Sequence, residues 1–357
     1  MIQFAKSELI YTLPQVSGQA FRKAVLYHND TAINANAPLQ AFLMAGAYNF
    51  DISGVLTHAG LWATLLPTLP DATLAVGLTD VLKAINIRTA AIGSDTYTGT
   101  DTVLVINGQI REDFFDIYTQ ATFADTYLQN RFLSYRQAPE SVRLTQRLFV
   151  HFLSNWASLP TGLGLSVAYN TPTVFGEYQQ LQALDDVALN KVYTLSFQPV
   201  ALLANYTGTE RPTAIKLAIT ANNGDDVLIE KTFELDYTAA LSELELLYLN
   251  YFGLWETLRV TGDLKVDMDF TVDNIIVKNQ KRDVNSAYTQ TLSIQLGEHN
   301  SLNAQDILMD LGHSDNIFWL KDNHPIRLTK AFKTSTAYLA SSRFDNPVLD
   351  FGVTYQY

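Results

Sequence analysis

The chain has 357 residues, of which 47% are hydrophobic and only 17% are charged, so it can bury a large core and is not disordered by composition. Its formal net charge of −12 argues against nucleic-acid binding, because phosphate contacts need clustered Lys and Arg side chains. It contains no cysteine, which excludes disulfides, thiolate metal sites and a cysteine nucleophile.

The chain is rich in Tyr and Phe, and Thr, Val and Ile are frequent, a composition that favours strands over helices. The first third is therefore expected to be mainly β. The opening residues, 1–6, lack the basic and apolar regions of a secretory signal. Thr79 can cap a short helix over residues 80–85. Residues 113–135 mix aromatic and polar side chains, which predicts a helical or irregular connector. A domain boundary is expected near residues 137–141, where a proline interrupts the apolar pattern.

Strict alternation of apolar and polar residues is the main signal in the rest of the chain, and it indicates half-buried strands. It occurs over residues 163–169, 215–220, 264–273 and 349–357. In the third of these runs, the face expected to be buried consists of Leu264, Val266, Met268, Phe270 and Val272. The longest uncharged stretch, between Arg147 and Glu177, is broken by Gly, Pro and Asn, so no membrane insertion is expected.

Turn and helix signals separate these strands. The Asn223-Gly224 pair predicts a hairpin between the strand at 215–220 and the next one, because Asn-Gly supplies positive φ angles. Residues 321–324 predict a second turn before Pro325. Asn303 can cap a helix over residues 304–311, with Gly312 just past its end.

An aromatic run at residues 246–259 is too apolar for an exposed loop and predicts an anchor inside a β-sandwich. Tyr251, Phe252 and Trp255 are expected in the core of the middle sandwich. The full set of residues expected to act as core or interface anchors is Tyr251, Phe252, Trp255, Trp319, Phe351 and Tyr355.

These elements together predict a mainly β chain with two or more β-sandwich-like domains and a small α+β part at the C-terminus. The expected divisions are an N-terminal β domain over residues 1–115, a connector over 116–142, a β-sandwich domain over 143–280, and an α+β unit over 281–357 that completes the sandwich.

No catalytic, cofactor or metal site is predicted. Asp267 and Asp269 share one strand face and can converge on a cation, but they fit a solvated strand face better. The six histidines show no metal-ligand spacing, although His299 and His313 flank the predicted helix. The sequence at residues 164–168 approaches a nucleophile elbow but lacks its second glycine. The chain is therefore expected not to be an enzyme.

From about Arg143 onward the chain resembles tail-associated structural virion proteins of phages and prophages of Bacteroidetes-type bacteria. Three stretches carry the likeness: residues 147–155, residues 191–197, and the aromatic run through 262. The resemblance implies a structural virion component with no catalytic residues to carry over. It also implies partners among other virion proteins and copies of the same chain, and location in the virion.

The sequence leaves two alternative functions. A hydrolase would need a cleft with a convergent His and carboxylate, and the other alternative is a surface-binding or carbohydrate-binding Ig-like module. Such a module needs an exposed aromatic platform, which the four tryptophans can supply if they are not buried: Trp62, Trp156, Trp255 and Trp319.

Overall fold

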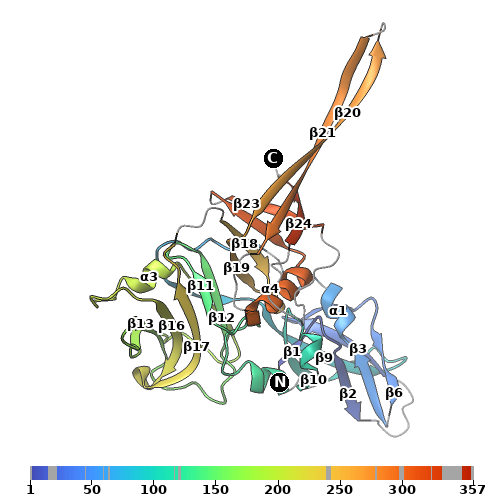
Figure 1. The fold of residues 1–357 in the computed structure, drawn as a ribbon. Helices are drawn as coiled ribbons and strands as arrows, with labels where there is room; N and C mark the ends of the chain where they lie inside the picture. The colour runs from blue at the N-terminus through green and yellow to red at the C-terminus, as the bar shows by residue number, and fades with distance from the viewer. Residues whose placement is uncertain are drawn as a thin grey trace.

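The computed structural model describes residues 2–14, 22–44, 46–58, 60–62, 65–115, 117–119, 122–238, 243–277, 280–296, 301–322, 324–331 and 348–354. As the composition predicts, the chain is mainly β, with several sheets and few helices (Figure 1). Its described strands form two two-sheet units and one seven-stranded sheet that carries a helix. Among the described residues, no helix is long and apolar enough to cross a membrane.

The N-terminal unit pairs a six-stranded sheet with a three-stranded one. The larger sheet runs in the order β1-β10-β9-β3-β4, with β5 also on β3, and the smaller runs β2-β7-β6. Aromatic and aliphatic side chains from both sheets, including Tyr48, Phe50 and Leu26, fill the shared core. The elements are β1 (Ile2–Phe4), β2 (Ile10–Pro14), β3 (Arg22–His28), β4 (Thr31–Ala32), β5 (Leu39–Gln40), β6 (Phe42–Met44), β7 (Ala47–Asp51), α1 (Ser53–His58), β9 (Leu82–Ala91) and β10 (Thr98–Ile106).

The middle unit is a β-sandwich whose five-stranded sheet, β11-β17-β16-β13-β14, faces a three-stranded sheet, β12-β15-β8. The two sheets share one core, which includes Phe152, Leu165, Phe197 and Ile219. Its elements are β8 (Ala75–Thr79), β11 (Glu140–Val142), β12 (Leu148–Leu153), β13 (Gly164–Asn170), β14 (Gln179–Ala183), β15 (Val192–Phe197), α3 (Pro199–Leu203), β16 (Ala214–Ala221), the 3-10 turn η3 (Asn222–Gly224) and β17 (Asp226–Leu235).

The third unit is a seven-stranded sheet in the order β19-β18-β22-β23-β24-β21-β20, with helix α4 packed on it. Leu311 of α4 shares a core with Tyr248, Leu292 and Phe351. Its elements are β18 (Leu244–Leu249), β19 (Trp255–Val260), β20 (Leu264–Val277), β21 (Gln280–Gln295), α4 (Ser301–His313), β22 (Ile317–Lys321), β23 (His324–Lys330) and β24 (Val348–Thr354).

Two of the expected divisions cut across these sheets. Strand β8 lies inside the stretch assigned to the N-terminal domain, but it pairs with β15 of the middle sandwich, Thr79 opposite Val192. The division after residue 280 falls just inside β21, which is hydrogen-bonded to β20 along its length. Residues 244–354 therefore contribute to one sheet.

Several local predictions agree with the structure and others do not. β16 and β17 form the hairpin expected around Asn223-Gly224. The helix expected over residues 304–311 is α4, but it begins at Ser301, so Asn303 lies inside its first turn and donates to the carbonyls of Ala138 and Pro139 instead of capping it, and Gly312 lies inside the helix. Strands β13 and β16, expected to be half-buried, are buried on both faces. A 3-10 turn, η1 (Glu112–Phe114), precedes the connector, which contains a π-helical turn, η2 (Phe123–Tyr127). The helix expected after Thr79 is wrong: a turn leads straight into β9 there, and β9 lies between β3 and β10 and pairs with both.

Candidate functional site

Phe252 is fully buried, but in a different place from the one expected. It lies in the turn between β18 and β19 and packs in an aromatic cluster with Phe4, Phe123 and Tyr135, its ring centroid 5.0 Å from that of Tyr135. This cluster joins the N-terminal strand to the connector rather than filling the middle sandwich. Tyr251 is half-buried at the same cluster and stacks on His313, with ring centroids 4.3 Å apart.

Trp255 is half-buried and also lies outside the core of the middle sandwich, so that expectation is wrong. Its ring packs near Phe318, with the centroids 5.8 Å apart, in a small cluster between β12 and the seven-stranded sheet. Its indole N–H donates to the carbonyl of Leu65 at 2.8 Å. The Trp255 carbonyl accepts a hydrogen bond from Nε2 of His151 at 2.7 Å. Trp255 therefore acts as a bridge between units.

The remaining anchors belong to the third unit. Phe351 is fully buried in its core, where Trp319 packs from the side as a half-buried residue. Tyr355 lies outside the described residues. All four tryptophans are half-buried, and each packs against a different hydrophobic cluster. They do not form the shared exposed platform that a Trp-based carbohydrate site needs.

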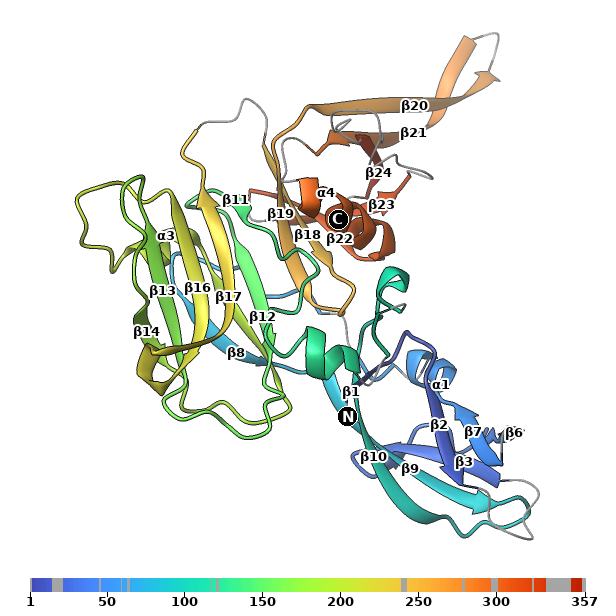
Figure 2. The same ribbon diagram turned by 60° about the horizontal axis from the view of Figure 1, so that its bottom comes forward.

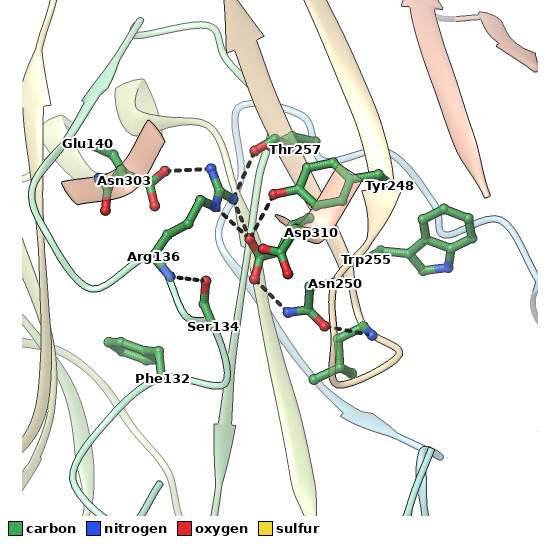
Figure 3. Close-up of polar contacts among 12 residues, drawn as sticks. Phe132, Ser134, Arg136, Glu140, Tyr248, Asn250, Trp255, Thr257, Asn303 and Asp310 are labelled. Carbon is green, nitrogen blue, oxygen red and sulfur yellow. Dashed lines mark hydrogen bonds and ion pairs between the residues drawn. The ribbon is translucent and has the colours of Figure 1, made fainter. Parts of the chain in front are cut away.

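A buried polar junction holds the connector, β19 and the β18–β19 turn together (Figure 3). Arg136 donates from Nε to Oε2 of Glu256 at 2.9 Å, and from Nη1 to Glu140 at 3.2 Å. The other Glu256 oxygen accepts from the amide of Asn250 at 2.6 Å. Asn250 Oδ1 in turn accepts the backbone N–H groups of Phe252 and Leu254, which fixes the turn. Sequence periodicity gave no sign of this junction.

The two acids at this junction have opposite electrostatics. The Arg136 guanidinium and Lys231 outweigh burial at Glu256 and hold its pKa at about 2. Asp310 lies close by on α4, where burial and the Glu256 charge raise its pKa well above the usual value. Its Oδ1 accepts a hydrogen bond from the backbone of Tyr251 at 3.3 Å, and its Oδ2 has no hydrogen-bond partner. These surroundings favour the ionised form of Glu256 and the protonated form of Asp310.

No catalytic arrangement appears among the residues that the structure describes. Ser166, the candidate elbow serine, is buried in β13 and shares a hydrogen bond of 2.7 Å with Thr220. His151 is buried, with its pKa lowered by desolvation, and both ring nitrogens have partners. No group of three metal-binding side chains occurs in the described ranges. Asp267 pairs with Lys265 at 2.8 Å on the solvent-exposed strand β20, which agrees with a solvated face.

Strands β20 and β21 project from the body of the molecule as a two-stranded arm (Figures 1 and 2). Within the described strands, β24 pairs with β21 only over Thr291–Gln295, so residues 280–290 pair with β20 alone. Two side chains of the face expected to be buried are exposed on β20: Val266 is 41% and Met268 is 53% accessible, whereas Leu264 packs, half-buried, against the core of the third unit. The alternation correctly predicted a strand, but burial of its apolar face is wrong at Val266 and Met268. Phe270 and Val272 lie in the strand, where only the backbone is described.

Comparisons with known proteins add no function. No family model matches the chain, and no curated protein matches it. Among solved structures, a chimeric titin Z1Z2 carrying a decorin peptide matches 67% of this chain and 93% of its own, at 10% identity and a TM-score of 0.16. A plexin A4 extracellular region matches 99% of this chain and 38% of its own, at 7% identity and a TM-score of 0.20. These scores are too low to support an argument.

Proposed function

We propose that the chain is a non-enzymatic structural component of a phage virion, in the tail or associated with it, that acts through contacts between subunits. One observation carries the subunit-contact part of this proposal: the β20–β21 arm. An isolated two-stranded ribbon is marginally stable in water; in the described sheet the outer edge of β20 has no partner strand, and the side chains of Val266 and Met268 are exposed. Such an arm gains stability by lying against a neighbouring subunit.

The remaining support comes from rigidity and from the resemblance to virion proteins. The connector and the start of β19 are held together by the buried pair of Arg136 and Glu256, which suits a part that holds a fixed shape. Because every copy carries a formal charge of −12, assembly is expected to strengthen as salt or divalent cations screen the repulsion.

The test measures assembly of the full chain by mass photometry over rising protein and magnesium concentrations. Wild-type protein should form oligomers, and Met268→Glu should shift it toward monomers without lowering its melting temperature. The matched control is Leu78→Glu, because Leu78 is also exposed, at 62%, but lies on β8. Equal assembly of both variants contradicts a role for the arm. Absence of the chain from purified phage particles, checked by mass spectrometry, contradicts the virion role.

A further inference from the structure

A pocket of about 470 Å³ opens in the middle sandwich between the loop that follows β13 and the loop that precedes β16. Its floor is made by the rings of Tyr169, which is buried, and Tyr206, which is half-buried, with centroids 5.0 Å apart. The pocket lies on a different unit from the β20–β21 arm, so an inference about the pocket does not depend on the proposed role of the arm.

The loops around this pocket are held in place before any ligand arrives. A single oxygen of the Glu210 carboxylate accepts hydrogen bonds from the hydroxyls of Thr171, at 2.7 Å, and Thr173, at 2.6 Å. The Tyr206 hydroxyl donates to the Glu210 carbonyl at 2.6 Å. A Cβ at Gly176 would lie 2.3 Å from the Tyr169 carbonyl oxygen, so only glycine allows this close approach. Preorganised walls lower the entropic cost of binding.

Several polar side chains face the pocket without a protein partner. Glu177, Gln179, Thr207 and Thr209 line it, all are exposed, and none has a side-chain hydrogen bond to another residue of the described structure. No Lys, Arg or His side chain lines it among those residues. Phe175 stands between two lining residues, and it is the most exposed large apolar side chain in the described structure, at 87%.

We propose that this pocket binds a neutral saccharide. Carboxylate, amide and hydroxyl groups together offer acceptors and donors for the hydroxyls of a sugar, and carboxylate hydrogen bonds are the stronger ones. The Glu177 and Glu210 carboxylates, with no cation beside them in the lining, disfavour an anionic ligand. The rings of Phe175 and Tyr206 supply flat apolar surfaces for the C–H faces of a sugar. A peptide held through Phe175 alone would make no use of Glu177 or Gln179.

The experiment uses saturation-transfer difference NMR on the full chain with four neutral hexasaccharides, built from glucose, mannose, galactose and N-acetylglucosamine. At least one of them should bind. Phe175→Ala and Glu177→Gln should each weaken that binding by about tenfold, since loss of one well-placed contact is worth on the order of a factor of ten. Both side chains are exposed, so the melting temperature of each variant should stay at the wild-type value.

The matched control is Ile92→Ala, because Ile92 is exposed, at 49%, on the N-terminal unit. It should bind the sugar as the wild type does. The proposal is overturned if none of the four sugars binds at millimolar concentration, or if binding survives both pocket substitutions. It is also overturned if Phe175→Ala alters self-association and leaves sugar binding unchanged, because Phe175 then serves a protein partner.

Discussion

Arg136 and Glu256 lie 120 residues apart in the sequence and form an ion pair in which the two side chains are only 4% and 3% exposed. The pair fastens the connector to the first residues of β19 (Figure 3). Charges so deeply buried are tolerated only when their remaining hydrogen-bonding groups also have partners. Here Glu140 and the carbonyl of Thr257 accept from Arg136, and Asn250 donates to Glu256.

Arg136→Met should destabilise the protein strongly, by about 3–5 kcal/mol, because it leaves the Glu256 charge buried with its main partner gone. Urea unfolding followed by circular dichroism measures the loss. The control is Arg143→Met, which breaks a pair with Glu243 whose side chains are 29% and 25% exposed and should cost about 1 kcal/mol or less. Similar losses in both variants would mean that burial does not set the strength of the junction.

Asp310 makes stability depend on pH. Its pKa is raised in the folded state, so above about pH 4 the unfolded chain binds fewer protons than the folded one, and stability falls as pH rises toward the folded pKa. The slope reaches at most about 1.4 kcal/mol per pH unit. Asp310→Asn should remove the share of this fall that Asp310 causes; Glu245, whose pKa burial raises to about 7, adds a further share in the same direction. Unfolding by urea between pH 4.5 and 8 tests it, and parallel curves for the two proteins would contradict the assignment.

Glu256 acts in the opposite direction and in another pH window. Its folded pKa of about 2 lies below the unfolded value, so its contribution to stability is complete above about pH 4.5 and is lost as pH falls toward 2. Asp310→Asn should therefore keep the acid-induced loss while it reduces the loss at higher pH. Melting temperatures recorded from pH 2 to 5 separate the two effects.

Phe252→Ala should cost more than Trp255→Ala, although tryptophan is the larger side chain. Phe252 is fully buried against three aromatic rings, so its removal leaves a cavity worth about 3–5 kcal/mol. Trp255 is half-buried and its loss opens onto solvent. Thermal unfolding of the two variants shows which one loses more stability. A larger loss of stability for Trp255→Ala would mean that the contacts between β12 and β22 contribute more than the Phe252 cluster.

Truncation after residue 347 should abolish soluble folding. Strand β24 lies between β21 and β23, and it buries Leu349 and Phe351 in the core of the third unit. Without it both neighbours present open edges, which invite aggregation. Expression of the truncated chain followed by size-exclusion chromatography measures the outcome. Soluble protein with the wild-type melting temperature would show that β24 is dispensable.

Local features of the fold could be predicted from the sequence because they depend on neighbouring residues. Alternation at 163–169 gave β13, the Asn223-Gly224 pair gave the β16–β17 hairpin, and Asn303 marked α4. The strand at 349–357 was also predicted, and the structure describes it through Thr354. The resemblance to virion proteins remains an expectation that no comparison tests.

Whether a strand face is buried or exposed could not be predicted from neighbouring residues. Alternation says that Val266 and Met268 share a face, but the same pattern fits a face packed on a core and a face that awaits a partner. Ion pairs between residues far apart in the sequence could not be predicted either, because the residues around Arg136 do not indicate that it pairs with Glu256. The loops that build the pocket around Tyr206 have no periodicity, so their convergence with Thr171 depends entirely on the pairing of β13 with β16.

Strand β8 has a consequence for how the chain reaches its folded state. Thr79 meets Thr194 across 115 residues of sequence, so the three-stranded sheet of the middle sandwich closes only after β15 has been synthesised. Pairing across so long a separation carries a high loop-closure entropy and slows folding. A fragment that starts at residue 143 would expose the edge of β15 that β8 normally occupies. The N-terminal segment thus acts as a capping strand for the middle sandwich, and removal of residues 75–79 should leave the edge of β15 open to pairing with another chain.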